Sequence, residues 1–221
     1  MILCIETATT NCSVAIFNGT DCVALKEDSA SGYSHNEQLH VFINAVCLQA
    51  GINLNQLTAI AVSKGPGSYT GLRIGVSAAK GLCYALAIPL IAVETLSVLG
   101  RAASGAPTDF IVPMIDARRM EVYSCVLDRN FKPLETADAK VLNGSSYADY
   151  LEKGNVTFIG NGVEKWQTVC EHLNAKYIPG ALPSAREMGV LANEFFSKKE
   201  FVDVAYFEPY YLKNFQTFKK A

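Results

Sequence analysis

The first hundred residues alternate between short apolar runs and turn residues, a pattern that predicts strands followed by alternating helices and strands. ILCIE at 2–6, CSVAIF at 12–17 and DCVALK at 21–26 have the length of strands and are separated by turn-forming residues. The expected order of this half is βββαβαβα. Its later elements are a helix from Ser34 to residue 50, a strand at 58–63, a helix that Thr70 caps and Pro89 stops, a strand at 90–94 and a helix near 95–103.

The second half repeats the layout of the first. After a linker, SGAPTD at 104–109, the segment 110–130 has an apolar strand that ends in a carboxylate, a tight turn and another strand, so Asp116 matches Glu6. The repeat predicts an α/β chain of two lobes built from duplicated βββαβα units, residues 1–104 and residues 105–221, with a cleft between them. The later elements expected are a strand at 138–142, a helix at 145–153, a strand at 156–160 and helices at 163–173 and 184–198.

The two long helices of the first half are apolar over most of their circumference. A helix that covers one face of a sheet needs an apolar arc of only about 100°. Gly71, Gly75 and Gly81 each cost up to about 1 kcal/mol relative to alanine, and close contact between helices would offset this. We therefore predict a partner surface on these helices, or a homodimer when the chain is alone, and the alternative is that layers of the same chain cover both faces. The predicted interface residues are Leu39, Val41, Phe42, Ala45, Leu48, Leu72, Gly75, Ala78, Ala79 and Leu82.

Composition narrows the classes of partner and the compartment. The chain has 221 residues, of which 50% are apolar and 18% charged, with a net charge of −2, so any RNA contact is confined to a local patch. Seven cysteines occur singly, without a C-x-x-C pair, which is typical of reduced thiols. The N-terminus lacks the basic segment of a signal peptide, and the longest apolar run is too short to span a bilayer. We expect a cytoplasmic protein with no membrane contact.

The stretch SKGPGSYTGLRIG at 63–75 contains the glycines of a phosphate loop but not its lysine. A Walker loop needs a lysine directly after its second glycine, whereas Leu72 follows Gly71 and Lys64 precedes the turn. The glycines and Pro66 therefore indicate a corner between a strand and a helix.

Two histidines, His35 and His40, are the candidates for a metal site. A spacing of five residues separates them by roughly 140° around a helix, so they cannot share a metal as histidines four residues apart do. The sequence therefore predicts no metal site.

Four motifs together resemble one known family. IETATTNCSVAIF, SKGPGSYTGLRIGVSAAKGL, IDARRMEVY and EPYYL are similar to the TsaB (YeaZ) family, and the duplicated layout resembles the actin/Hsp70/sugar-kinase (ASKHA) superfold. The resemblance covers nearly the whole chain. It implies a non-catalytic subunit with no cofactor of its own, which binds a TsaD-like catalytic paralogue. With a TsaE-like ATPase and tRNA, in a complex that uses ATP, this subunit supports transfer of a threonylcarbamoyl group to N6 of adenosine 37.

Kinases and ATPases of the superfold carry an Asp-x-Gly-Thr-Thr turn, in which the glycine lets backbone amides approach a phosphate. Here Ala8 replaces that glycine, and Arg118 stands at the same place in the second copy, so we interpret both turns as relics. The residues that retain a candidate role in phosphate, nucleotide or RNA contact are Glu6, Thr9, Thr10, Lys64, Asp116, Arg118 and Arg119.

Two enzyme functions remain as alternatives. One is an ASKHA-type phosphotransferase or ATPase that uses Glu6 and Asp116 as metal carboxylates. The other is a metal-dependent (glyco)peptidase, which matches an older label for the family. Nucleotide turnover would favour the first, and protease activity or a bound metal would favour the second.

Overall fold

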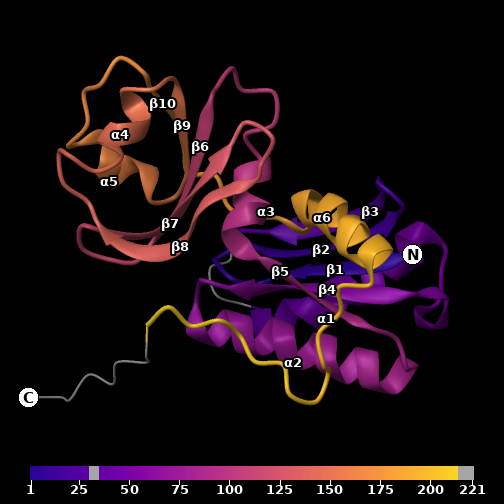
Figure 1. Cartoon of the computed structure of the whole chain (residues 1–221). Coiled ribbons are helices and arrows are strands. Elements are labelled where there is room, and N and C mark those ends of the chain that lie inside the picture. Colours follow the sequence, from indigo (N-terminus) through magenta and orange to yellow (C-terminus); the bar gives the residue numbers. More distant parts are fainter. Residues whose placement is uncertain (30–34, 214–221) are drawn as a thin grey trace, which may run out of the picture.

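The computed structural model describes residues 1–29 and 35–213 and arranges them in two lobes, each built on a five-stranded sheet (Figure 1). The first sheet has the strand order β3-β2-β1-β4-β5. β1 pairs with β2 antiparallel and with β4 parallel, and Ile2 opposes Ala59 in the parallel pair. The strands are β1 (Ile2–Glu6), β2 (Cys12–Asn18), β3 (Asp21–Asp28), β4 (Ala59–Gly65) and β5 (Leu90–Glu94).

The second sheet repeats this topology in the order β8-β7-β6-β9-β10. Its strands are β6 (Phe110–Asp116), β7 (Glu121–Asp128), β8 (Pro133–Val141), β9 (Val156–Gly160) and β10 (Ala175–Pro179). The sequence did not predict β10, which pairs parallel with β9 and completes the repeat. The predicted two-lobed, duplicated α/β fold is confirmed.

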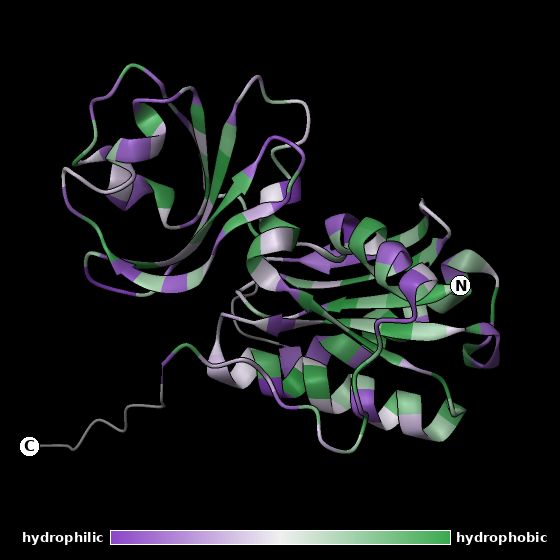
Figure 2. Ribbon diagram, in the orientation of Figure 1, coloured by the Kyte–Doolittle hydropathy of each residue, from purple (hydrophilic) through white to green (hydrophobic). Residues whose placement is uncertain are grey.

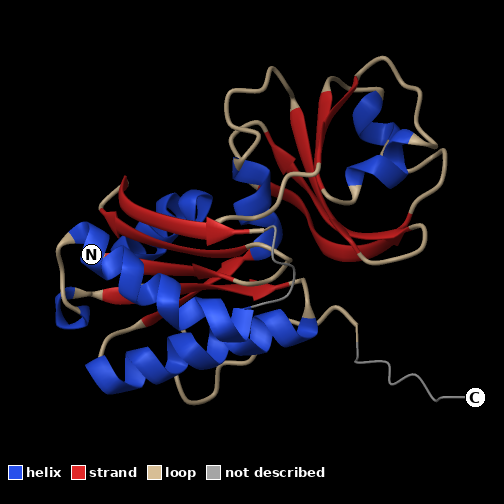
Figure 3. Cartoon of the chain, turned by 180° about the vertical axis from the view of Figure 1, so that it is seen from behind, coloured by secondary structure: helices blue, strands red, loops and turns tan. Residues whose placement is uncertain are grey.

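Helices cover both faces of the first sheet, which explains why β1 is apolar at consecutive positions. α1 (His35–Ala50) and α2 (Tyr69–Leu86) cover one face, where Leu3 and Ile5 point, and Ser34 lies outside the described residues. α6 (Ala185–Lys198) covers the other face, where Ile2 and Cys4 point (Figure 3). α6 follows the second sheet in sequence yet packs on the first, so the division at residue 105 does not separate the two cores.

The second lobe has shorter helices than its sequence suggested. α4 (Ala148–Leu151) and α5 (Val163–Gln167) replace the helices expected at 145–153 and 163–173, and they pack around an aromatic cluster of Tyr147, Phe158 and Trp166. α3 (Thr95–Arg101) contacts strands of both sheets and lies between the lobes. A single 3-10 turn, η1 (Leu54–Gln56), precedes β4.

The chain after α6 runs back across the first lobe to the second. Val202 bridges to Leu90 at the sheet edge, and Lys80 on α2 donates hydrogen bonds to the carbonyl oxygens of Ala205 and Phe207. Lys213 at the end of this segment forms an ion pair with Glu121 on β7. We call residues 201–213 the C-terminal strap, because they connect α2 to the second lobe (Figure 1).

All seven cysteines are free, and six are buried while Cys22 is exposed. Among the described helices, none combines the length and apolar character that crossing a membrane requires.

Candidate functional site

The turn after β1 is folded around the carboxylate of Glu6. One carboxylate oxygen accepts a hydrogen bond from the Ala8 backbone N–H at 2.7 Å, and the other accepts one from the Ser63 hydroxyl on β4. Glu6, Ala8 and Ser63 are almost fully buried. In a phosphate-binding turn the backbone amide would face an incoming anion. Here the Ala8 amide donates its hydrogen bond to the Glu6 carboxylate of the same chain instead.

Other parts of the first lobe close the turn further. The Ala8 carbonyl accepts from the Ser68 N–H at 2.7 Å, and the Thr9 carbonyl oxygen lies 2.7 Å from Nε2 of His35. A Cβ added at Gly67 would overlap the Ala8 backbone. Thr9 is buried and Thr10 half-buried, so the turn is packed against the starts of α1 and α2.

Burial also changes the chemistry of Glu6. Desolvation raises the pKa of its carboxyl to about 7, and the hydrogen bonds from Ser63 and Ala8 act in the opposite direction. A carboxyl with this pKa that has no exposed atoms is poorly suited to hold a solvent-borne metal ion. Within the described residues, no group of three or more His, Cys, Asp or Glu side chains is arranged to bind a metal.

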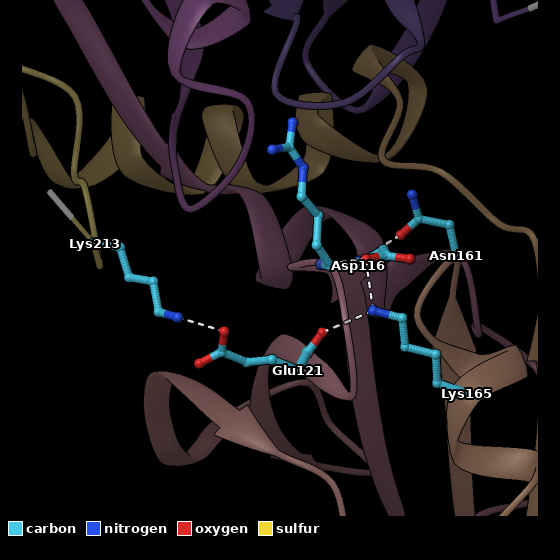
Figure 4. Close-up of polar contacts among 6 residues, drawn as sticks. Asp116, Glu121, Asn161, Lys165 and Lys213 are labelled. Atoms are coloured by element: carbon cyan, nitrogen blue, oxygen red, sulfur yellow. Dashed lines mark hydrogen bonds and ion pairs between the residues drawn. The ribbon is translucent and has the colours of Figure 1, made fainter. Parts of the chain in front are cut away.

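The corresponding turn of the second lobe is exposed and held by ion pairs. The Asp116 carboxylate accepts from Lys165 Nζ at 2.7 Å, and the Asp116 N–H donates to the side-chain oxygen of Asn161 at 2.9 Å. Lys165 also donates to the Glu121 carbonyl oxygen at 3.1 Å, while the Glu121 carboxylate is paired with Lys213 of the C-terminal strap (Figure 4). Each carboxylate near this turn therefore has a lysine partner.

The residues at the tip of this turn have an unfavourable backbone conformation. Arg118 and Arg119 have φ angles of 69° and 51°, in the left-handed region. This conformation costs roughly 1–2 kcal/mol for residues other than glycine. Both side chains are exposed. Arg118, which the sequence aligns with the phosphate-turn glycine of the superfold, therefore stands at the surface in a conformation that glycine would adopt more easily.

The structure corrects half of the predicted interface. Five of its ten residues lie in the core or face the turn after β1, so a partner cannot contact their side chains: Leu39, Phe42, Leu72, Gly75 and Ala79. The sequence predicted that Gly71 and Gly75 allow close contact between helices. Both instead lie against Thr7, and an added Cβ at Gly71 would also lie 3.3 Å from Cδ2 of His35 at the start of α1. A Cβ at either would overlap Thr7, so these glycines let α2 approach the turn. The N-cap of α2 is Ser68 rather than Thr70.

Apolar residues nevertheless remain partly or fully exposed on the outer side of α1 and α2. Val41 is 62% exposed and Leu48 is 84% exposed, and Ala45 lies between them on the same helix face. On one side of α2, Ile74, Ala78 and Leu82 are partly exposed, and Gly81 and Ala85 are exposed. We call these eight residues the helix surface; Figure 2 shows the apolar character of the two helices, and Figure 3 shows them side by side on the outside of the lobe. Ile74 was not among the predicted interface residues, although its spacing of four from Ala78 places it on the same helix face.

Lys64 and the two histidines considered for a metal site do not come together in the structure. Lys64 pairs with Glu94 at 2.9 Å, and its carbonyl oxygen accepts from the Tyr210 N–H of the C-terminal strap. His35 is buried against the turn and His40 is exposed, so they do not converge on one site.

A cavity of about 510 Å³ lies between the lobes. Its walls include Asn11, Glu27, Gly180 and Glu187, and it does not include Glu6 or Asp116. A smaller cavity of about 230 Å³ lies between α2 and the C-terminal strap, beside Arg73 and Lys80.

Comparison with known proteins agrees with this architecture. Residues 29–218 match the family model described as "TsaD: tRNA N6-adenosine threonylcarbamoyltransferase". The chain is 30% identical to the tRNA threonylcarbamoyladenosine biosynthesis protein TsaB of Escherichia coli, over 99% of this chain and 97% of that protein. It is 31% identical to the protein of the same name from Bacillus subtilis, over 96% and 93%.

The solved structures point the same way. YeaZ from Pseudomonas aeruginosa superposes with a TM-score of 0.82 at 26% identity, covering 96% of this chain and 99% of that one. A hexokinase from Thermus thermophilus has a TM-score of 0.51 at 11% identity, covering 90% of this chain and 99% of that one, which shows the shared fold alone. With its duplicated ASKHA-like lobes and its full-length relatives, this chain belongs to the TsaB (YeaZ) family.

Proposed function

We propose that this chain is an accessory subunit in the formation of threonylcarbamoyladenosine in tRNA, and that it docks a TsaD-like catalytic paralogue through the helix surface. Relatives of similar length carry a name that assigns them to this biosynthesis. The proposed role is to bind and support the catalytic subunit, together with a TsaE-like ATPase. The reaction consumes ATP elsewhere in the complex, and tRNA is bound by the assembly.

The observation that carries this proposal is the exposed apolar strip on α1 and α2. Val41, Ala45 and Leu48 follow one another at helical spacing on α1, and Ala78 and Leu82 do so on the neighbouring helix α2. Exposed apolar residues gathered on two neighbouring helices are typical of an interface. A paralogue of the same fold has corresponding helices, so the two subunits can pack pairwise.

The closed turn supports a role without phosphate chemistry. Glu6 accepts from the Ala8 amide, and Ser68 donates to the Ala8 carbonyl, so the groups that would cradle a phosphate already have partners. Asp116 is paired with Lys165. These contacts weigh against the phosphotransferase alternative, which needs both carboxylates to be free for a metal.

The test is assembly with the TsaD homologue of the same organism. The two full chains are mixed at about 20 μM and analysed by size-exclusion chromatography with light scattering, and we expect one species of summed mass. Threonylcarbamoylation of tRNA by the reconstituted system should depend on this chain. If no complex forms and tRNA modification is unchanged without this chain, the proposal is wrong.

Two further measurements separate the alternatives. The isolated chain is examined by light scattering, because the same helix surface would also form a homodimer. It is then titrated with ATP and Mg²⁺ in a calorimeter. Tight binding with hydrolysis by the isolated chain would support the phosphotransferase instead.

A further inference from the structure

We propose that the turn between β6 and β7 is a contact for RNA phosphodiesters, made by the guanidinium groups of Arg118 and Arg119. We call residues 117–120 the arginine turn. The inference rests on the proposed function, since it names the surface through which this subunit would meet the tRNA bound by the assembly.

The arginine turn carries positive charge that has no acidic partner in the described residues. Of the two acidic side chains around the arginine turn, Asp116 is paired with Lys165 and Glu121 with Lys213 (Figure 4). Neither Arg118 nor Arg119 forms a side-chain hydrogen bond, ion pair or ring contact with any residue in 1–29 or 35–213. The turn therefore presents two positive charges that the described part of the chain does not neutralise.

Hydrogen bonds fix the backbone conformation of the arginine turn. The Arg118 N–H donates to the Asp116 carboxylate, the Asp116 N–H donates to Asn161, and the Glu121 N–H donates to the Arg118 carbonyl oxygen. These bonds keep both arginines in the left-handed conformation and expose both side chains. A glycine or asparagine would adopt this backbone more easily. A local requirement for folding therefore does not explain two arginines at the tip.

The position of the arginine turn, outside both cavities, indicates what shape of ligand it can bind. The arginine turn projects from the end of a hairpin, and neither arginine lines the 510 Å³ cavity between the lobes or the 230 Å³ cavity beside α2. A small nucleotide needs an enclosing pocket. A polyanion with repeated phosphates can instead be bound by an exposed pair of guanidinium groups. Because the chain as a whole is slightly acidic, such a contact must be local.

The experiment measures tRNA binding by the reconstituted complex of this chain with its catalytic paralogue. Fluorescently labelled tRNA is titrated by anisotropy at KCl concentrations from about 50 to 300 mM. The test variant is Arg118→Gln/Arg119→Gln. The matched control is Arg129→Gln/Lys132→Gln, which removes the same charge from the exposed β7–β8 hairpin at the other end of β7. Light scattering checks assembly of every complex.

We expect the test variant to assemble normally and to bind tRNA about tenfold more weakly at low salt. The slope of log affinity against log salt concentration should fall by about 1 to 2, because two phosphate contacts are lost. The control should leave both values unchanged.

Three outcomes would overturn the inference. Unchanged tRNA affinity and salt slope would show that the arginine turn does not contact RNA, although assembly through the helix surface would still stand. Loss of assembly in the test variant would show that the arginines bind an acidic protein surface. A change in ATP affinity without a change in tRNA affinity would show that they bind a free nucleotide. Failure of the wild-type chain to assemble would instead count against the proposed function itself.

Discussion

Glu6 at the end of β1 accepts a hydrogen bond from the hydroxyl of Ser63 on the neighbouring strand β4, and neither side chain is accessible to solvent. The same carboxylate accepts from the Ala8 amide, so one acidic group connects two strands and the turn between β1 and β2. The Ala8 amide therefore already has a hydrogen-bond partner within the chain.

The first prediction concerns pH and Glu6→Gln. Burial raises the pKa of Glu6 from the usual 4.5 to about 7, so between these values the folded state binds a proton that the unfolded state releases. The stability that Glu6 contributes is therefore complete below about pH 4.5 and is lost as pH rises through about 7. Glutamine stays neutral, so the variant should become more stable relative to wild type by roughly 2–3 kcal/mol between pH 5 and pH 8.

Urea unfolding at both pH values measures this difference. The control is Glu164→Gln, which makes the same substitution at an exposed position of α5. Comparing each variant with wild type cancels the effect of His35, whose pKa burial lowers. An equal difference between Glu6→Gln and wild type at pH 5 and pH 8 would contradict the prediction.

The second prediction compares two glycines of α2. A Cβ at Gly71 would overlap the backbone carbonyl oxygen of Thr7, whereas a Cβ at Gly81 meets nothing within 4 Å. Gly71→Ala should lower the free energy of unfolding by roughly 1–3 kcal/mol. Gly81→Ala should raise it by roughly 0.5–1 kcal/mol, because alanine favours the helix. Chemical denaturation checks both, and equal effects of the two substitutions would be evidence against the close approach of α2 to Thr7.

The third prediction tests the helix surface with two valines of equal exposure. Val41 on α1 is 62% exposed and Val141 on β8 is 63% exposed. Val41→Asp should weaken binding of the catalytic paralogue at least tenfold, because it places a charge in an apolar contact. Val141→Asp should leave binding unchanged, and neither variant should shift the melting temperature by more than a few degrees.

Binding is measured by titration calorimetry and folding by circular dichroism. Ala79 was also predicted at the interface, but it is fully buried. Ala79→Arg should therefore unfold the protein and cannot test partner binding. Equal binding by the wild type and Val41→Asp would exclude this part of α1 from the interface.

The fourth prediction concerns the C-terminal strap. Lys80 donates to the carbonyl oxygens of Ala205 and Phe207, at 3.1 and 2.9 Å. Lys80→Ala should increase hydrogen exchange of the segment 203–211 severalfold, because two of its attachments to α2 are lost. The comparison variant is Lys198→Ala, which removes an exposed lysine of α6 that pairs with Glu194. Unchanged exchange in Lys80→Ala would show that the strap is held by its other contacts.

The sequence by itself determined the duplicated fold, because alternation in strands, apolar runs in helices and turn residues are local signals. The match between Glu6 and Asp116 correctly predicted a turn after β1 and another after β6. β10 was missed because its short sequence, AKYIP, mixes polar and apolar residues and becomes a strand only by pairing with β9. The return of α6 to the first sheet was likewise invisible, since it depends on contacts between residues far apart in the chain.

The sequence also determined that α1 and α2 carry more apolar residues than one sheet face requires, but not which of them remain exposed. Leu39 and Leu72 were predicted at the interface and lie in the core, whereas Ile74 was overlooked and remains partly exposed. Composition reports how much of a helix is apolar. Only packing against the sheet and the Thr7 turn decides the rotation of each helix about its axis, and that rotation selects the residues left for a partner.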